Sequence, residues 1–556
     1  MTRAGKGQSI IEPTIDAWSR MDQKCNIIIN DPKEELHLRF YYKLRVRGFN
    51  VVVFNLMNSD KTNIYNPLGY AISAARKDDS QQTSDFVKQI GDVFFPPDKA
   101  DDPMWPNAAN AAFQQTALLL IDIYLEEERE MTRKSIKENW SQEEYNIKID
   151  ELWGHVTLYN VYEMMTELAS KKSDDPKLIK IGDDDVAKEK DYLTLLMDAT
   201  KALPENSSRK NVQHQNESLR AMSQSEKTIA SVYGISLTAI KFFADETIAG
   251  LTSGRPSQNF DIEGLAFPRR FEVRFDINFA KKHSYIGKRY VWTAYGDNQW
   301  SKPLGDKFNY SNTIKKKGWA TYYTKGIFKN RYTYFTLDVI NSKNKLLMKR
   351  YYLRFTKGYQ TSLNGHSYEY DEVLHSRIVK DGLLEEFRPQ VKNGHKRFIK
   401  YNSTYSKLIA SILPTDDGQL HSEKMRIISQ IDIHYSEEPQ AVFTVTPPHS
   451  QSYNKIMLIF LNQEFNMQVA KAYGVWADQQ PVYITMHMLD EAGNLQSEGK
   501  GIPGLQTKMS IGLGQGQYYT LILQTLQQLK DVYGVNCFTN QFARIGIDET
   551  RVAAYL

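Results

Sequence analysis

The sequence predicts an α/β protein in which two α/β segments, at opposite ends of the chain, form one domain. Short apolar strands alternate with helices in the first 70 residues, and the same alternation returns from Ala441. Residues from about 68 to 255 show helical periodicity with few strand patterns. From about 268 to 360, Tyr, Phe, Trp and Thr become dense and alternate, which favours antiparallel strands. A helical and a β-rich segment are therefore inserted between the two α/β halves.

The composition is that of a folded protein with several domains. A chain of 556 residues is too long for one core, and its 41% hydrophobic and 24% charged content excludes a disordered chain. Two cysteines, Cys25 and Cys537, cannot form a disulfide framework, and no His/Cys group has zinc spacing. No apolar run reaches the ~18–20 residues of a membrane span, and no signal-peptide pattern is present. The sequence as given predicts a soluble cytoplasmic chain.

The first α/β segment opens with a glycine-rich turn that leads into a helix. Its strands are continuous apolar runs, as in a parallel sheet buried on both faces, and Asn66-Pro67 marks its end. The predicted elements are a helix over residues 8–19, a strand over 26–30, a helix over 34–45 and a strand over 50–54.

The middle and the end of the chain are predicted from the same kinds of pattern. Helices are expected over residues 105–133, 142–170, 191–202 and 219–251, with polar linkers around 171–177 and 204–216. The second α/β segment comprises strands over 441–446, 482–489 and 519–524 and an amphipathic helix over 456–473. The predicted division is a nucleotide-binding domain (1–70 and 436–556), an all-α domain (71–265), a β-rich insert (266–360) and a mixed connector (361–435).

A candidate phosphate loop lies at the start of the chain, where Gly5-Lys6-Gly7 precedes the first predicted helix. Glycines let backbone N–H groups converge on phosphates, a lysine reaches the β and γ oxygens, and the helix start adds the positive end of its dipole. Because Gly-Lys pairs are common and Gly7 stands where Ser or Thr is usual, the pattern alone is more typical of a basic amino-terminal turn.

An acidic pair, Asp490 and Glu491, directly follows an apolar strand. Such a pair lies at the carboxyl edge of a sheet, where open α/β folds bind ligands. Asp490 is a candidate for holding Mg²⁺, and Glu491 for orienting and polarising an attacking water. Alone, the pair is more typical of an acidic turn after a buried strand. His487 is predicted to be a strand residue and not a ligand or base.

Gln524 ends another predicted strand and is a candidate sensor of the γ-phosphate. A helix closed by Gly534 follows it. A lysine loop, an acidic strand end and a glutamine strand end occur together by chance less often than any one of them.

The order of these motifs resembles the type IV secretion coupling proteins, the TraG/TraD-like conjugative ATPases. Thr2-Arg3-Ala4-Gly5-Lys6-Gly7 is similar to the family's phosphate loop T-R-S-G-K-G, in which glycine follows the lysine. Residues 27–36 resemble the family's strand followed by D-P-K-G-E-L, and the similarity covers roughly residues 1–125 and 440–534. Further similarities are Tyr65-Asn66-Pro67-Leu68 to Y-N-P-L, Trp105-Pro106-Asn107-Ala108-Ala109 to W-x-x-A-A, Asp490-Glu491-Ala492-Gly493-Asn494-Leu495 to D-E-x-x-N-L, and residues 523–529 to L-Q-S-x-x-Q-L.

The resemblance implies a RecA-like P-loop ATPase domain, split by an all-α domain and a β-rich insert, that uses ATP and Mg²⁺. It implies a hexamer around DNA at the cytoplasmic face of the cell membrane, which delivers single-stranded DNA with its relaxase to type IV secretion channel proteins. The helical domain would contact the relaxosome. Asp490 would bind Mg²⁺, Glu491 and Gln524 would act in catalysis, and the phosphates would be bound by Thr2, Arg3, Ala4, Gly5, Lys6, Gly7 and Gln8.

Three features depart from the family pattern. The membrane anchor, the first strand and the leading glycine of the phosphate loop are not found, which predicts a truncated member. Residues 508–515 contain no arginine, although relatives carry there a candidate finger for the neighbouring subunit's site. Residues 535–556 do not resemble the family's next strand.

A basic and aromatic stretch sets the β-rich insert apart. Residues 281–357 contain 18 Lys and Arg against three Asp, although the net charge of the chain is only +4. Cations neutralise phosphates and aromatic faces stack on unpaired bases at ~1–3 kcal/mol each, so a single-strand-binding module is one interpretation. A β sandwich with an aromatic core and solvated lysines is equally favoured, and docking to acidic channel surfaces or headgroups is a third. The candidate DNA-binding residues are Lys315, Lys316, Lys317, Trp319, Lys349 and Arg350.

The leading functional hypothesis is an ATP-driven DNA translocase that couples conjugative DNA to a secretion channel. The alternative is a catalytically degenerate DNA- or channel-binding adaptor that has lost turnover. A double-stranded DNA pump for chromosome segregation would share the core, but the Asp31-Pro32-Lys33 strand end and the large helical insert argue against it.

Overall fold

The computed structural model describes most of the chain, and all structural statements below concern these residues. The described residues are 7–58, 62–96, 103–138, 140, 142–175, 189–222, 226–341, 343, 350–357, 370–371, 376–377, 382–392, 394–400, 428–446, 451–496, 499–523 and 525–533.

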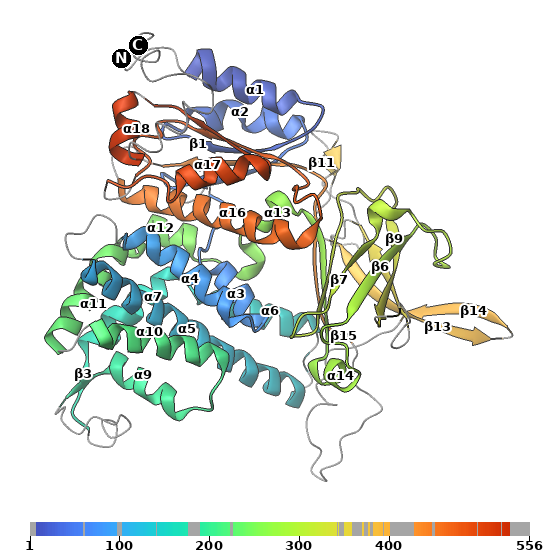
Figure 1. Cartoon of the computed structure of the whole chain (residues 1–556), viewed down its shortest axis with the longest axis horizontal. Coiled ribbons are helices and arrows are strands. Elements are labelled where there is room, and N and C mark those ends of the chain that lie inside the picture. Colours follow the sequence, from blue (N-terminus) through green and yellow to red (C-terminus); the bar gives the residue numbers. More distant parts are fainter. Residues whose placement is uncertain are drawn as a thin grey trace.

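A five-stranded parallel sheet combines strands from both ends of the chain (Figure 1). β1 lies between β16 and β17, with Ile28 opposite both Val442 and His487. The α/β class and the joining of the two ends into one sheet, both predicted from the sequence, are confirmed. In spatial order the strands are β18 (Gln517–Leu521), β17 (Thr485–Leu489), β1 (Asn26–Asn30), β16 (Gln440–Val445) and β2 (Asn50–Asn55).

Helices cover both faces of this sheet because its strands are apolar on both sides. Ile27 and Ile29 pack in one buried cluster with α1 (Glu12–Arg20) and α2 (Glu35–Val46). Ile28 on the opposite face belongs to a second cluster that includes α16 (Asn454–Val475). Parallel sheets are generally covered in this way.

α16 differs from the amphipathic helix expected over 456–473. It lies between the sheet and the helical part of the molecule (Figure 1) and is buried along most of its length, including the polar residues Asn462, Gln463 and Glu464. Because protein covers it on both sides, no solvent-facing stripe remains.

The helical part lies on the far side of α16 from the sheet (Figure 1). The segment 204–216, expected to be a polar linker, belongs mostly to α10, whose buried Arg209 pairs with Asp122 at 2.9 Å. One helix expected over 142–170 is two, divided at Gly154. The helices are α3 (Gly69–Arg76), α4 (Ser80–Phe94), α5 (Met104–Lys137), α6 (Gln142–Trp153), α7 (Leu158–Ser170), α9 (Tyr192–Ala202), α10 (Ser207–Met222), α11 (Glu226–Ile240) and α12 (Glu246–Thr252), with short helices Lys241–Ala244, Pro256–Gln258 and α13 (Glu263–Ala266) and a pair of two-residue strands, Lys172–Ser173 and Lys190–Asp191.

The β-rich part is built around an aromatic core. Its two larger antiparallel sheets have the orders β14-β13-β10-β9-β6-β7 and β15-β5-β8. Trp292, Tyr322 and Phe335 are fully buried between them, and the last two rings lie 5.2 Å apart. The strands are β5 (Arg269–Phe275), β6 (Arg289–Tyr295), β7 (Tyr310–Thr313), β8 (Trp319–Tyr323), β9 (Tyr332–Ile340), β10 (Tyr351–Thr356), β13 (Leu383–Lys392), β14 (His395–Lys400) and β15 (Ile428–Tyr435), with the small pair Tyr370–Asp371 and Ser376–Arg377 and the helix α14 (Ile277–Lys282).

Candidate functional site

The carboxyl ends of β1 and β17 bring two acidic loops together. Because these strands are parallel neighbours, Asn30 lies opposite Leu489, and the next residues of each strand leave the same edge of the sheet. The Asn30 side-chain amide donates a hydrogen bond to the Asp490 carbonyl at 2.7 Å. Asp490 and Glu491 therefore stand beside the turn Asp31-Pro32-Lys33, which follows β1.

Glu491 is held from two sides. The Lys33 ammonium lies 3.1 Å from its Oε1, and the Asn494 side-chain amide donates to its Oε2 at 3.1 Å. The hydrogen bond from Lys33 to Glu491 raises the pKa of Lys33, so Lys33 stays charged at neutral pH. Glu491 also has a left-handed backbone, with φ of 50°. Non-glycine residues in this region are strained and cluster at functional sites.

Asp31 is a buried carboxyl next to this pair. Its Oδ2 accepts a hydrogen bond from the His37 backbone N–H at 2.7 Å, at the start of α2. Burial raises the pKa of Asp31 and the nearby Asp490 raises it further, while backbone N–H donors oppose both effects. A cation bound at this edge would relieve the repulsion between the two carboxylates.

These oxygens fit the preferences of Mg²⁺, the metal that the sequence implies. Carboxylates are its usual protein ligands, and in phosphate-transfer sites one or two of them suffice beside water and phosphate oxygens. Asp490 with Asp31 supplies such a pair. In the described part of the chain, no group of three or more His, Cys, Asp and Glu side chains is placed to hold a metal ion by itself.

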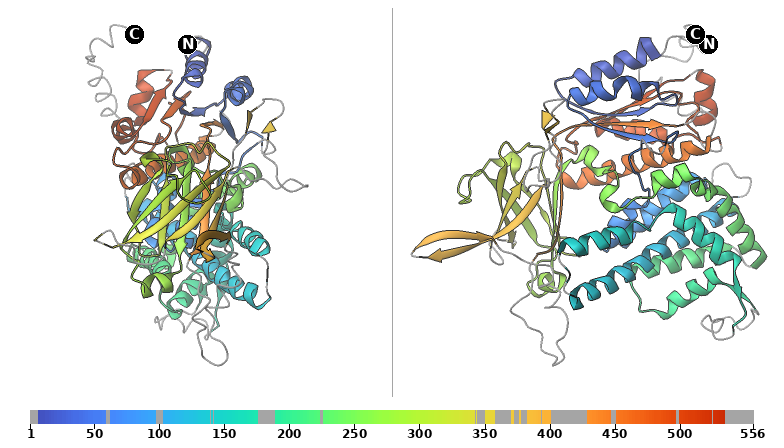
Figure 2. Two further views of the ribbon diagram at one scale, coloured as in Figure 1. Left: turned by 90° about the vertical axis from the view of Figure 1, so that its right-hand side faces the viewer. Right: turned by 180° about the vertical axis from the view of Figure 1, so that it is seen from behind.

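The predicted phosphate loop falls mainly outside the described residues, which exclude Thr2, Arg3, Ala4, Gly5 and Lys6. Gly7 opens a helical turn, Gly7–Ile11, that continues into α1, and Gln8 is exposed. The buried Ile11 and Ile15 pack with the sheet. Because this helix runs into the start of β1, its own start lies toward the carboxyl edge. Figure 1 and the reverse view in Figure 2 show that start on the side of the sheet where α18 (Leu526–Tyr533) lies.

α18 also contacts the loop that follows the acidic pair. The Tyr533 hydroxyl donates to the Ala492 carbonyl at 3.1 Å. The start of the first helix, α18 and Glu491 thus gather at one end of the sheet. Gln524, the predicted phosphate sensor between β18 and α18, is outside the described residues, and its role stays a prediction.

The predicted DNA-binding residues lie in varied surroundings. Lys317 pairs with Asp78 at 2.7 Å, and Arg350 makes two hydrogen bonds of 2.8 Å to Asp338. Trp319 is buried. Lys315 and Lys316 are exposed, and Lys349 is outside the described residues. Within the described members of this set, Lys315, Lys316 and the paired Arg350 are exposed, and the DNA-binding role of all six stays a prediction.

His487 has no contact with the acidic pair. It is fully buried in β17, its ring stacks on Tyr519 with centroids 4.1 Å apart, and its Nδ1 lies 3.1 Å from the Tyr518 carbonyl. These contacts agree with the expected role as a strand residue.

Lys508 is the first residue of the segment 508–515, which contains no arginine. Its side chain points into the protein. It lies on α17 (Leu505–Gly514), where its ammonium donates to Asn462 Oδ1 at 2.9 Å and sits 4.3 Å from the centre of the Phe465 ring. Burial lowers the pKa of Lys508 to about 8. Because it is buried against α16, its ammonium does not reach the surface of the described chain.

We expect Lys508→Met to stabilise the protein at neutral pH. The pKa of Lys508 is lower in the folded chain than in the unfolded chain, so the unfolded chain binds more protons between about pH 8 and 10.5. Stability of the wild type should rise with pH over that window. The variant should gain about 1–3 kcal/mol at pH 7 and lose this rise, measured by urea unfolding at pH 7 and pH 9. The control Lys88→Met, at an exposed lysine, should change neither the stability at pH 7 nor its rise with pH. A pH slope in Lys508→Met equal to that of the wild type would contradict the prediction.

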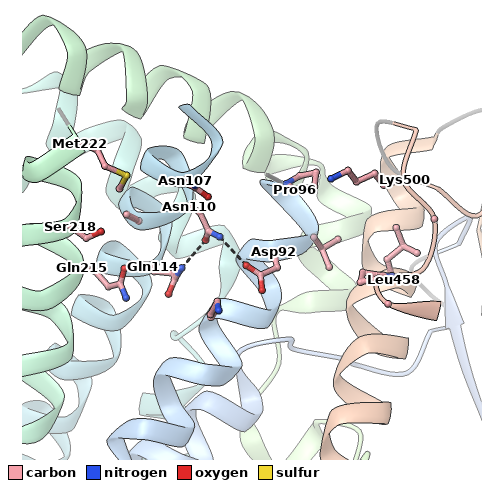
Figure 3. Close-up of a pocket in the computed structure, with 16 residues that line it drawn as sticks. Asp92, Pro96, Asn107, Asn110, Gln114, Gln215, Ser218, Met222, Leu458 and Lys500 are labelled. Atoms are coloured by element: carbon pink, nitrogen blue, oxygen red, sulfur yellow. Dashed lines mark hydrogen bonds between the residues drawn. The ribbon is translucent and has the colours of Figure 1, made fainter. Parts of the chain in front are cut away.

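A separate cavity of about 830 Å³ lies where α4, α5 and α10 face residues 500–504 (Figure 3). Its polar wall includes a chain of hydrogen bonds, from Gln114 to Asn110 at 2.9 Å and from Asn110 to Asp92 at 3.1 Å. The cavity is lined by neither Asp490 nor Glu491 and is distinct from the site at the sheet edge.

Asp490 and Glu491 were predicted from their place after an apolar strand, whereas Asn30, Asp31 and Lys33 had no predicted role at the site. The strand end Asp31-Pro32-Lys33 was the available indication, since it repeats at β1 the pattern of a buried strand followed by charged residues. The motif does not show that β1 and β17 are neighbours in the sheet.

Comparison with known families gives two matches. A family model for conjugative DNA transfer of the type IV secretory system matches residues 1–270. A model for the TraM recognition site of TraD and TraG matches residues 485–544. No curated protein sequence matches the chain. No helix in the described residues is long and apolar enough to cross a membrane. The two matched regions contribute β1 and β17, the strands that bear the two acidic loops.

Proposed function

The chain belongs to the TraG/TraD-like family of type IV secretion coupling proteins, and on this premise we propose that it is an ATPase that drives conjugative DNA toward a secretion channel. The observation that carries the proposal is the meeting of two loops from opposite ends of the chain, Asp31-Pro32-Lys33 and Asp490-Glu491, at one edge of the parallel sheet. Open α/β sheets bind ligands at this edge. We propose that the sheet is a RecA-like nucleotide-binding domain.

ATP and Mg²⁺ are the proposed cofactors. The residues 2–8 would hold the phosphates, with Lys6 at the β and γ oxygens, and Asp490 with Asp31 would hold the metal. When bound, Mg²⁺ would neutralise the phosphate charge that builds up during transfer. The family's Gln524 would sense the γ-phosphate.

Glu491 is the proposed acceptor of the proton from the attacking water. Its carboxylate is fixed by Lys33 on one oxygen and by Asn494 on the other, so its orientation is set before a ligand arrives. The Lys33 side chain is 55% exposed, so it can move aside when a nucleotide enters. Lys33 is thus a positioning residue for Glu491.

Relaxosome components are the proposed protein partners. The region that matches the TraM recognition site includes α17, β18 and α18, which flank the proposed nucleotide edge. A partner bound there would sit close to the site of hydrolysis. We further propose assembly as a hexamer around DNA, delivery of single-stranded DNA with its relaxase, and docking to channel proteins at the cytoplasmic face of the membrane.

Phosphate release from ATP by the purified full chain, with and without DNA, tests the proposal. We expect turnover that DNA stimulates and that Lys6→Ala reduces through weaker ATP binding. DNA or ATP binding without any turnover in the wild type would overturn the enzyme proposal in favour of the adaptor. Sedimentation with ATP and DNA would test the hexamer.

A further inference from the structure

The strands β13 and β14 form a two-stranded ribbon that projects from the β-rich part into solvent (Figures 1 and 2). β14 is the edge of its sheet and pairs only with β13 within that sheet. The pairing runs from Phe387 opposite Lys400 to Lys392 opposite His395. Five residue steps at ~3.4 Å each make the ribbon about 17 Å long.

The ribbon has a net positive charge. Residues 387–400 contain five Lys and Arg and no Asp or Glu. Lys400, at the base, pairs with Glu385, whereas Arg388, His395, Lys396 and Arg397 are exposed. Strand pairing places Gln390 and Arg397 on one face and Val391 and Lys396 on the other, so cations occupy both faces.

The base of the ribbon packs against the aromatic core. The Phe398 ring lies 4.2 Å from the Trp300 ring and 5.0 Å from the Tyr352 ring. The Trp300 indole N–H donates to the Phe335 carbonyl at 2.8 Å. The projecting part is thereby held at a fixed angle to the aromatic core, as a docking element requires.

Edge protection is the simpler explanation of these charges, because lysines on edge strands prevent pairing between molecules. Beyond Phe387, β13 has lost β10 as a neighbour, so both strands of the ribbon are edges and protection accounts for the cations on each of them. The ribbon nevertheless extends beyond the core. Protection alone does not explain this projection.

We propose that the β13–β14 ribbon docks into the major groove of duplex DNA. The groove, ~12 Å wide, admits a two-stranded ribbon, and cations on both of the ribbon's faces would meet the phosphates on both of the groove's walls. Residues 388–397 contain no Phe, Tyr or Trp, and single strands are usually held by stacking on several exposed aromatic rings. The ribbon therefore fits a duplex better than a single strand. This inference rests on the proposed DNA-handling function and adds a second, peripheral contact with the duplex ahead of the motor.

Duplex binding by the full chain, measured by fluorescence anisotropy over a range of salt concentrations, tests the inference. The double variant Lys396→Ala/Arg397→Ala should weaken duplex binding at least tenfold and lower the salt slope by about 2, since each lost phosphate contact removes about 0.9. DNA-independent ATP turnover should be unchanged. The matched control Lys281→Ala/Lys282→Ala, which removes two exposed lysines of α14, should leave duplex affinity within about twofold.

Other outcomes separate this inference from the proposed function. Unchanged duplex affinity in the ribbon variant would overturn the proposal that the ribbon binds DNA, whether or not the chain hydrolyses ATP. Loss of binding to anionic phosphatidylserine vesicles, with duplex binding intact, overturns it in favour of a membrane surface. Aggregation of the variant without loss of duplex binding would support edge protection and would likewise overturn the proposed DNA docking.

A cross-linking experiment tests the same contact without replacing the lysines and arginines of the ribbon. A photo-crosslinker on His395→Cys, next to the ribbon's turn, should attach to duplex DNA more strongly than the unsubstituted chain, whose own two cysteines report the background. Cross-linking at background level would overturn the proposal.

Discussion

Glu491→Gln is expected to abolish steady-state ATP hydrolysis while ATP binding stays intact. A glutamine keeps the size of the side chain and the contact with Asn494, but it cannot take a proton from water. Removing a positioned general base costs about 10²- to 10⁴-fold in rate. Phosphate release measures the turnover, and fluorescent-nucleotide titration measures the binding.

Glu35→Gln is the matched control for this substitution. Glu35 is an exposed carboxylate in the first turn of α2, close enough to Lys33 to raise its pKa, but it makes no ion pair with it. Its replacement should leave turnover within about twofold. Equal activity of Glu491→Gln and the wild type would show that Glu491 is not the base, and the acidic pair would then be a structural turn.

Arg270→Met is expected to cause the largest loss of stability. Arg270 is buried and donates to both carboxylate oxygens of Asp261, at 2.8 and 2.9 Å, and lies 3.4 Å from Glu263. Although burial raises the pKa of Glu263, Arg270 and Lys471 hold it well below its usual value. Removing one partner of a buried ion pair costs about 3–5 kcal/mol, because the remaining charges stay buried without compensation.

The dependence of this loss on pH gives a sharper test. Glu263 has a lower pKa in the folded chain than in the unfolded chain, so its ion pairs stabilise the fold above the unfolded pKa and are lost as pH falls through the folded one. The difference between the wild type and Arg270→Met should therefore shrink below about pH 4. Urea unfolding at pH 7 and at about pH 3, below the unfolded pKa of a glutamate, measures it.

Arg133→Met controls for loss of an arginine. Arg133 pairs with Glu130 at 2.7 Å, but both side chains are more than 60% exposed, and such pairs contribute about 0–1 kcal/mol. The double variant Arg270→Met/Asp261→Asn should recover part of the loss, since Asp261 loses its arginine partner in the single variant. Glu263, in contrast, keeps Lys471 at 3.0 Å. A cost for Arg270→Met no larger than for Arg133→Met would contradict the buried-network explanation.

Apolar strands were the most predictable part of the fold. The strand over 26–30 was predicted with its observed bounds, and β2, β16 and β17 within a few residues, because a strand covered on both faces must be continuously apolar. α10 was missed because its polar surface looks like that of a linker. Its buried Arg209 is tolerated only where Asp122, 87 residues away in the chain, accepts its hydrogen bond.

The basic insert illustrates what composition leaves open. Its aromatic residues could equally have been a stacking surface or a core, and the structure buries Trp292, Trp300 and Trp319. Likewise, the sequence does not show which cations are exposed. Lys317 is partly covered and paired with Asp78, whereas Lys396 and Arg397 of the ribbon are exposed, in a segment expected to be a connector.

The sequence by itself determined the α/β class, the family and the two residues that follow β17, because these depend on local apolar runs and on short motifs. Only the tertiary structure decided which charged groups meet. Asn30 and Asp490 are 460 residues apart in the chain, yet they are joined by a hydrogen bond of 2.7 Å. Strand order sets that contact, and it is fixed by the packing of α1, α2 and α16 on the two faces of the sheet, which no local pattern encodes.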